Sequence, residues 1–544
     1  MIAVGLLVVS CTQSGTGPNL PRPRSSSAGT ITSTADAPTT TTEPTTANPD
    51  CLAAFCIVYH LSEGALWSDG RPVTAEDFAT TAANMPESVY ESVRSVEIID
   101  PNNIKVLLNT PLGAWESMFL RVLPSVYAPG TDMTTTPSNG AFRFTEWVPG
   151  DRIVVTRNES PWPGRVPISG QSWGDVSEIR FVFRPDPAEM IDALETGEVD
   201  VIVSRSTDVM TSITEVASAN HVLSPGPFWE HLDFHHEDPL LAQMWVREAV
   251  ALGIDREKIL DRTVRLIDPT ADSLDSSLWL ANDFRYDDSY PFAYDPQRAV
   301  ELLEEHFCEP ARDGIYDCQG RRMSFFLAAT SDDPDRVQAF ESIQEDLEAI
   351  GIEVNPLFRT RSTFLSPDFL FAPSDVWQMI NFSWRARSDP QVPRGTIECA
   401  GELNVNRYCN PDVDRLLNMA ARSPDQETRT ALLSEADEVY LADLGVIPLY
   451  QKRVLLAWSR TLFGPVPNVG PSTDLWNVGA WSGKQSITIA LDAEPTHLDP
   501  TRTDDDNANV VLSTLLYGAF GMTPDFRFVP VLADVVELIE GSPG

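Results

Sequence analysis

The stretch at residues 60–78, HLSEGALWSDGRPVTAEDF, carries the most specific local pattern of this sequence. Its first residues read as the end of a strand, and Asp69-Gly70 predicts a tight turn, because glycine readily adopts the left-handed backbone that such turns use. Thr74 then stands where a helix would begin, and Asp77 follows at the spacing of a capping box. The stretch therefore predicts a strand, a turn and a capped helix in close succession.

Strand-like and amphipathic segments alternate along the rest of the chain. The expected strands are residues 177–183, 199–203, 323–329, 352–358 and 447–450, and the expected helices are residues 187–196, 334–350, 411–421 and 426–444. In the helix at 334–350 the apolar residues recur every three or four positions, and Gly351 stops it before the next strand. This alternation predicts an α/β fold class.

The chain of 544 residues is too long for one hydrophobic core, since single cores stop growing near about 250–300 residues. With 39 basic and 79 acidic residues the net charge is −40, which disfavours nucleic acid and anionic lipid as partners. The apolar run at residues 2–9 is too short to cross a bilayer, which needs about 20 residues. No phosphate-cradling glycine loop occurs, and we expect no cofactor.

The amino terminus indicates export and anchoring. Val8-Val9-Ser10-Cys11 resembles a bacterial lipobox, so residues 1–11 are predicted to be a lipoprotein signal with Cys11 as the lipid attachment site. A buried core strand is the alternative for the apolar run. The following residues 12–50 are rich in Ser, Thr and Pro, a composition that cannot offset its own ordering entropy, and they favour a disordered tether.

Six further cysteines fall into three pairs that are near in sequence: Cys51 and Cys56, Cys308 and Cys318, Cys399 and Cys409. Six cysteines allow many connectivities, but short loops favour local closure in an exported chain. A metal cluster would want C-x-x-C pairs with nearby histidines. The spacing thus favours three local disulfides and no metal site.

Several segments resemble family 5 of the bacterial extracellular solute-binding proteins, the peptide- and nickel-binding receptors of ABC importers. The similar segments are residues 60–78, 138–158 (SNGAFRFTEWVPGDRIVVTRN), 197–200 (GEVD), 246–256 (VREAVALGIDR) and 408–417 (YCNPDVDRLL). The resemblance implies a bilobal periplasmic-binding-protein-like fold of type II, in the large family 5 form with an extra subdomain, its two lobes joined by crossing strands. Ligand would be enclosed between the lobes.

The order of the segments departs from the family. Residues 486–500 (SITIALDAEPTHLDP), 515–520 and 529–534 resemble the opening of the family's chain, yet they stand near the end of this one. Circular permutation predicts that residues 535–539 pair with residues 56–61 as the family's hairpin. A truncated receptor followed by the stub of another copy is the alternative. We favour permutation, because each segment occurs once and a single core can then form.

These observations give a domain plan. Residues 1–11 are the signal and 12–50 the tether, residues 51–245 form lobe I with the extra subdomain, and residues 246–454 form lobe II. Residues 455–544 return to lobe I and include the permuted segment 486–544.

The predicted ligand-binding residues are Trp384, Arg387, Asp389, Trp229, Asn139 and Tyr517. Peptide receptors of the family carry an aspartate that pairs with the peptide's α-amino group, and Arg387 stands about where it would lie. This favours an anionic, glycan-like or blocked ligand, unless Asp389 takes the aspartate's place; a solvated surface arginine is the alternative for Arg387. Aromatic walls suit peptide side chains of varied chemistry.

Two other functions are alternatives to the capture of a peptide-like solute. Strand alternation puts Trp229, His231, Asp233 and His235 on one face, which would suit nickel or haem, but a half-buried strand with satisfied histidines is the simpler interpretation. A secreted α/β hydrolase would need a nucleophile elbow, and no G-x-S-x-G occurs. We therefore predict a monomeric receptor, not an enzyme, that delivers a peptide-like or anionic solute to ABC importer permease subunits; a surface sensor with the same fold is a further alternative.

Overall fold

The computed structural model describes residues 48, 50–86, 88–159, 165–386, 394–468, 475–502 and 505–541. Its largest element is a mixed sheet of ten strands in the order β13-β12-β14-β8-β15-β7-β16-β6-β5-β4. In that order the strands are Glu353–Arg359, Ser324–Thr330, Met379–Arg385, Ala219–Phe234, Val446–Ser459, Val201–Ser204, Ser486–Leu491, Glu178–Phe183, Arg152–Arg157 and Phe142–Val148.

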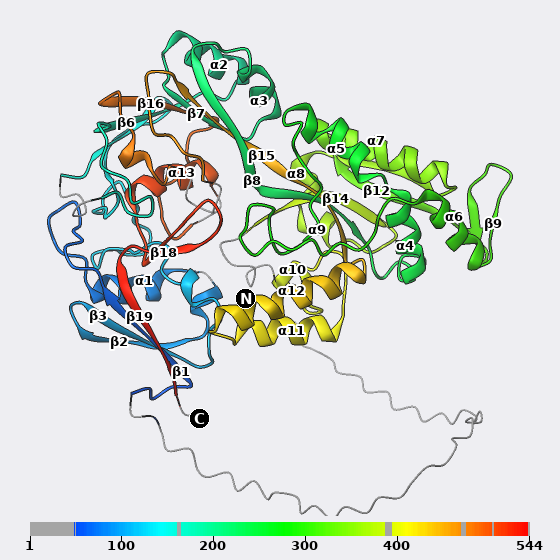
Figure 1. Ribbon diagram of the computed structural model, residues 1–544, viewed down its shortest axis with the longest axis horizontal. Helices are drawn as coiled ribbons and strands as arrows, with labels where there is room; N and C mark the ends of the chain where they lie inside the picture. Colours follow the sequence, from blue (N-terminus) through cyan, green and yellow to red (C-terminus); the bar gives the residue numbers. More distant parts are fainter. Residues whose placement is uncertain are drawn as a thin grey trace, which may run out of the picture. The chain divides into compact units, whose positions relative to one another are not determined.

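The two long strands at the centre of this sheet, β8 and β15, connect two hydrophobic cores. They pair antiparallel from Ala219↔Ser459 to Asp233↔Val446, and Figure 1 shows them side by side. β8 continues into pairing with β14, whereas β15 continues into pairing with β7. β15 contributes Leu449 to one core and Leu456 to the other, whereas the buried apolar residues of β8 belong to the first core and to a smaller cluster that includes Ala219. The long paired strands β8 and β15 join the two parts of the ten-stranded sheet, and the predicted bilobal α/β fold with crossing strands is confirmed.

The larger core, which we call lobe II, lies among β8, β12, β14 and the helices that follow β8. These helices are α4 (Met244–Gly253), α5 (Arg256–Arg262), α6 (Pro296–Glu305), α7 (Pro334–Ala349), α8 (Arg361–Phe364), α9 (Pro367–Leu370), α10 (Arg394–Ile397), α11 (Pro411–Ala421) and α12 (Gln426–Ala442). A small sheet of β9 (Cys308–Pro310), β10 (Tyr316–Cys318) and β11 (Arg321–Arg322) projects after α6.

The second core, lobe I, lies among β4 to β7, β16 and a separate four-stranded sheet. That sheet has the order β19-β1-β3-β2, with strands Ala533–Glu540, Phe55–Leu61, Asn103–Leu108 and Val93–Asp100. Of the lobe I helices, α1 (Ala75–Asn84) and α13 (Asp506–Leu515) pack in this core, whereas α2 (Pro187–Thr196) and α3 (Thr207–Ile213) form a separate cluster with residues of β7, β15 and β16. β17 (Phe520–Met522) pairs with β18 (Phe528–Pro530). The single-turn 3-10 segments are η1 (Ser88–Tyr90), η2 (Trp115–Ser117), η3 (Val264–Leu266) and η4 (Val478–Ala480).

The predicted bounds of three amphipathic helices agree closely with the structure. Helices α2 and α11 have the predicted bounds, and α7 ends one residue before its predicted end, with Gly351 at a positive φ of 81° directly after it. The strand predicted at 447–450 is only the start of β15, which runs on to Ser459 through two irregularities in its pairing.

The stretch at residues 60–78 serves the packing of lobe I. Gly70 has a φ of 87° in the predicted turn, and its N–H donates to Trp67 O at 2.9 Å. Asp77 is 1% exposed, and its carboxylate accepts from the Thr74 N–H at 2.8 Å and from the Trp67 indole at 3.0 Å. One buried carboxylate thus ties the turn to the start of α1.

The carboxy-terminal segment is part of the core of lobe I. β16 lies between β7 and β6 and pairs in parallel with β6 along its full length. β19 pairs antiparallel with β1, from Val535↔His60 to Ile539↔Cys56, which confirms the predicted pairing. Residues 508–515 of α13 are all buried.

All three predicted local disulfides are present: Cys51–Cys56, Cys308–Cys318 and Cys399–Cys409. The second joins directly paired residues of β9 and β10. The third closes the loop between α10 and α11. Cys11 lies outside the described residues. Among the helices that the structure describes, none combines the length and the apolar character that crossing a membrane requires.

Candidate functional site

A cavity of about 680 Å³ lies where β8, β14 and β15 meet the amino-terminal end of α13. This volume is in the range of small-molecule sites, about 300–1,000 Å³. Both lobes contribute to its wall. The lining residues are Arg205, Phe228, Trp229, Asp233, Leu274, Ser276, Ser277, Leu278, Trp279, Leu280, Asp333, Arg336, Arg361, Leu365, Phe382, Ser383, Trp384, Arg385, Ala386, Thr396, Ile397, Leu403, Tyr440, Val446, Lys452, Asp492, Asp506 and Asn507.

Aromatic rings from two adjacent strands form the centre of the wall. Trp384 of β14 pairs in register with Trp229 of β8. The His231 ring lies 4.6 Å from the Trp229 ring and 4.4 Å from the Phe382 ring, centroid to centroid, and is stacked at 6.1 Å on Trp384. These rings offer a flat apolar surface that makes few demands on the shape of a ligand.

A buried ion network supports the cavity beside this aromatic cluster. Glu230 is 1% exposed; its carboxylate lies 3.0 Å from an Arg336 nitrogen and 2.9 Å from Lys452 Nζ. Lys452 also lies 3.0 Å from Asp333. Burial would raise the pKa of Glu230, but the charges of Lys452 and Arg336 outweigh it and lower that pKa to about 2. The carboxylate is therefore ionised whenever the protein is folded at ordinary pH.

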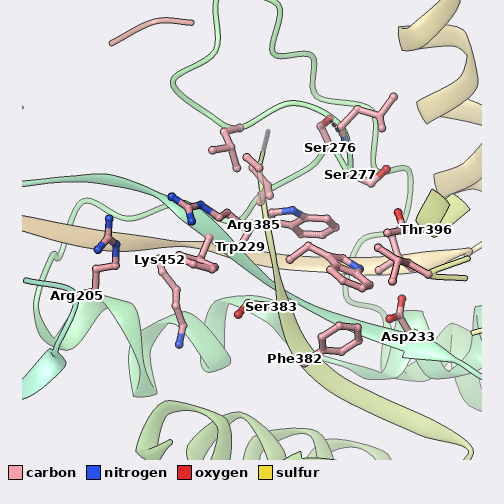
Figure 2. A pocket seen from close by; sticks show the side chains of 18 of the residues that line it. Arg205, Trp229, Asp233, Ser276, Ser277, Phe382, Ser383, Arg385, Thr396 and Lys452 are labelled. Carbon is pink, nitrogen blue, oxygen red and sulfur yellow. Dashed lines mark hydrogen bonds between the residues drawn. The ribbon is translucent and has the colours of Figure 1, made fainter. Parts of the chain in front are cut away.

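Cations are concentrated at this cavity in a chain whose net charge is −40. The wall carries five cationic side chains against four carboxylates: Arg205, Arg336, Arg361, Arg385 and Lys452 against Asp233, Asp333, Asp492 and Asp506. Figure 2 shows Arg205, Lys452 and Arg385 on one side of the view and Asp233 and Thr396 on the other. Lys452 and Arg385 are paired there with Asp333 and Asp506.

Two contacts tie the lobes together next to the cavity. Arg385 on β14 forms an ion pair with Asp506, the first residue of α13. The Thr207 hydroxyl of α3 donates to Asp335 of α7 at 3.3 Å. Because each contact joins an element of lobe I to one of lobe II, both would be lost or remade if the lobes moved apart.

The loop that carries Ser276, Ser277 and Trp279 is anchored by one buried acid. Asp437 of α12 accepts from the Ser276 hydroxyl at 2.6 Å, from the Ser277 N–H at 3.1 Å and from the Ser277 hydroxyl. Burial raises the pKa of Asp437 to about 6, although the bonds from both serines oppose that rise. The serines face the cavity from a fixed loop.

The predicted site residues fall into three groups. Trp229 and Trp384 line the cavity. Asn139 and Tyr517 are 1% and 5% exposed, are not among the lining residues, and bond to each other: the Asn139 amide accepts from the Tyr517 N–H at 2.8 Å and donates to its carbonyl at 3.3 Å. Their arrangement joins the segment before β4 to the end of α13. Arg387 and Asp389 lie outside the described residues.

The histidines of the alternative nickel or haem interpretation are dispersed. The ring of His235 contacts the Ala372 carbonyl at 3.2 Å and the Trp377 ring, away from His231. Within residues 48–541, as far as the structure describes them, no group of three or more His, Cys, Asp or Glu side chains could hold a metal ion.

The ion network around Glu230 is the part of the site that sequence reasoning missed. Glu230, Arg336 and Lys452 are more than one hundred positions apart along the chain, so no local spacing reports their contact. One signal was present: Arg336 lies in the first turn of α7, where the helix dipole disfavours a cation. A carboxylate from elsewhere in the fold, Glu230, compensates for that placement.

The comparisons with known proteins agree with this geometry. The family described as "Bacterial extracellular solute-binding proteins, family 5 Middle" matches residues 55–395. The oligopeptide-binding protein OppA of Mycobacterium tuberculosis is 23% identical over 431 residues, covering 75% of this chain and 71% of its own.

Two solved structures show the same fold. The periplasmic EDTA-binding protein EppA superposes with a TM-score of 0.67 at 19% identity, covering 79% of this chain and 85% of its own. The oligopeptide-binding protein AppA of Bacillus subtilis, in complex with a nonapeptide, gives a TM-score of 0.58 at 19% identity, covering 81% and 89%.

A two-lobed chain with a cavity at its crossing strands is the architecture of a solute-binding receptor. The chain belongs to family 5 of the bacterial extracellular solute-binding proteins. The comparisons favour neither the hydrolase nor the sensor alternative.

Proposed function

We propose that this protein captures a small peptide-like or anionic solute between its two lobes and delivers it to the permease subunits of an ABC importer. The observation that carries the proposal is the cavity of about 680 Å³ at the crossing strands, with paired Trp229 and Trp384 in its wall. Capture requires enclosure and release, and the ion pair between Arg385 and Asp506 is a contact that lobe opening would break.

The solute class is supported mainly by the relatives. The wall carries five cationic side chains within an otherwise acidic protein, and three of them, Arg336, Lys452 and Arg385, are already paired with Glu230, Asp333 or Asp506. The relatives include an oligopeptide-binding protein and an EDTA-binding protein, and EDTA is a polyanion. The cavity volume suits a short peptide or a molecule of similar size.

The function requires capture without turnover, on the outer side of the cytoplasmic membrane. We propose that residues 1–11 direct export, that Cys11 carries the lipid anchor, and that residues 12–50 tether the receptor within reach of its importer. The receptor would act as a monomer without a cofactor. Retention of radiolabel from lipid precursors by the wild type, and its loss in Cys11→Ser, would test the anchor.

We also propose that this receptor is a circular permutant: the order of its segments along the chain is permuted relative to the family. The segments that resemble the family's opening, residues 486–534, pack into lobe I, and β19 pairs with β1 as a hairpin of the family would. The Gly541 N–H donates to Ala54 O at 3.1 Å, so the two strands could be joined by a short turn. A chain rebuilt with residues 486–541 ahead of residue 54 should fold and bind alike; failure to fold would contradict permutation.

Native mass spectrometry of protein purified from its own host tests the function directly. The full chain should carry a small molecule that denaturation releases, and Trp384→Ala should retain at least about tenfold less of it, since the truncation removes a buried aromatic contact. Trp245→Ala is the matched control, because that ring stacks on His306 and lies outside the cavity wall. A wild-type protein that carries no molecule, or equal loss in both variants, would contradict the proposal.

A further inference from the structure

The segment before η2 in lobe I touches the turn between α11 and α12 in lobe II. The Gly113 N–H donates to Ala421 O at 2.7 Å, and Gly113 O accepts from Gln426 Nε2 at 3.0 Å. The Trp115 indole N–H donates to Pro424 O at 3.1 Å. These hydrogen bonds join the two lobes directly, and two of them are made by the backbone of one glycine.

The two sides of this contact are fixed in different hydrophobic cores. Leu112 and Ala114, the neighbours of Gly113 in the chain, are each 4% exposed in the core of lobe I. Ala420, at the end of α11, is 1% exposed in the core of lobe II. Because protein interiors are close-packed, neither side can shift far without disturbing its own core. A change in the contact would therefore move one lobe relative to the other.

The contact lies far from the strands that connect the lobes. The α11–α12 turn precedes α12, whose 17 residues give a helix about 25 Å long, and β15 begins only after that helix. In Figure 1, α11 and α12 lie toward the bottom beside the blue part of lobe I, whereas β7 and the neighbouring ends of β8 and β15 lie toward the top. Rotation of the lobes about the crossing strands would therefore break this contact.

The closeness of the lobes leaves no room for a side chain at position 113. A methyl group there would overlap the carbonyl oxygen of Ala420 and lie 2.8 Å from Cδ of Arg429 on α12. Arg429 is 1% exposed, so it has little space into which to move. The φ of Gly113 is not positive, so alanine can adopt the same backbone. Only the approach of the other lobe excludes the methyl group.

We propose that residues 113–115 and the α11–α12 turn form a latch that holds the lobes together around the captured solute, and that Gly113 sets how closely the lobes approach. The latch rests on the proposed capture function and adds the contact that controls opening. Its bonds are made by backbone groups and by the side chains of Trp115 and Gln426, which are not among the residues that line the cavity. The latch therefore acts in the same way on solutes of any chemistry.

Hydrogen exchange and small-angle X-ray scattering of the full chain test the latch without any added solute. In Gly113→Ala the methyl group should keep the lobes apart. The amide at position 113 should then exchange at least about tenfold faster than in the wild type, as expected when the hydrogen bonds between the lobes are lost. The radius of gyration should increase, while exchange in β1 and β8 stays as in the wild type, because each lobe remains folded.

Gly140→Ala is the matched control. A methyl group there would lie 2.5 Å from backbone atoms of Thr514 and Leu515, which belong to the same lobe as Gly140. This variant should lower the protection of lobe I but leave the radius of gyration as in the wild type. Gln426→Ala serves if Gly113→Ala does not fold, because it removes the bond to Gly113 O without adding atoms; it should speed exchange at position 113 several-fold.

Two results would overturn the latch. One is exchange at position 113 and a radius of gyration that stay unchanged in Gly113→Ala and Gln426→Ala. The other is an equal increase of the radius of gyration in Gly140→Ala. Either result would leave capture standing, whereas a wild-type protein that carries no molecule from its host would refute capture.

Discussion

The buried carboxylate of Glu230 should contribute more to stability than any exposed ion pair of this protein. The substitution Glu230→Gln keeps the shape of the side chain and removes its charge. It leaves Arg336 and Lys452 inside the protein with Asp333 as their remaining described carboxylate partner. Removing one member of a buried charge network is strongly destabilising, because the remaining charges were desolvated to meet it.

The magnitude follows from the pKa of Glu230. The folded protein holds that pKa at about 2 against an ordinary value of 4.5, and each whole pKa step corresponds to about 1.4 kcal/mol. Glu230 thus contributes about 3 kcal/mol at neutral pH, which agrees with the 3–5 kcal/mol, roughly, for breaking a buried ion pair. We expect Glu230→Gln to lower the free energy of unfolding by that amount.

The contribution should depend on pH in a defined direction. Because folding lowers the pKa of Glu230, the stabilisation is fully present above about pH 5 and is lost as pH falls toward 2. Urea unfolding of the wild type and Glu230→Gln, followed by tryptophan fluorescence, should therefore give curves that differ by about 3 kcal/mol at pH 7 and converge as the solution is acidified.

Glu353→Gln is the matched control. The hydrogen bond from Arg322 lowers the pKa of Glu353 to a similar value of about 2, but its side chain is 34% exposed and water screens the pair. Its loss should change stability by about 1 kcal/mol or less. Equal effects of the two substitutions, or a Glu230→Gln effect that does not shrink in acid, would refute the reasoning.

Four further outcomes are expected. Asn139→Ala should lower the free energy of unfolding by about 2 kcal/mol in urea titrations, because both backbone groups of Tyr517 lose a buried partner; an unchanged curve would contradict the structural role. Arg385→Gln should speed release of the carried solute several-fold in dilution experiments, since the ion pair with Asp506 joins the lobes; unchanged release would count against that contact. Replacing Cys399 and Cys409 by serine should cost about 2–4 kcal/mol and lower solute retention, because Leu403 in the loop between them and Ile397 just before it line the cavity; a gain in melting temperature would be inconsistent with this. A chain ending after Trp481 should be rapidly degraded by protease, because β6 and β7 lose the strand between them; a stable product would show that the carboxy-terminal segment is dispensable.

The sequence predicted the helices whose ends and buried face are determined by residues within the helix itself. Helices α2, α7 and α11 begin at proline after an Asp or Asn cap, and their apolar residues recur at helical spacing, so both ends and the buried face are local information. The length of strand β15 could not be predicted in this way. Its start is apolar, but its remaining length depends on pairing with β8 and β7 from distant parts of the chain.

Two residues of the candidate site could be predicted, from the alternation of strand residues and from the resemblance to the family. Trp229 and Trp384 came from those two sources and line the cavity. Asn139 illustrates the difficulty: its amide makes paired bonds to the backbone of Tyr517, a contact that a motif does not reveal, and its ligand contact stays a prediction. Asp233 was visible as a strand residue, but its contacts with Asn406 and His231 exist only in the folded chain.

An electron-density map from crystals of protein purified from its host is the most direct test of the central claim, that the solute is held between the lobes at β8, β14 and β15. We predict density for a small molecule against Trp229 and Trp384. A carried molecule bound anywhere outside this cavity would contradict the account.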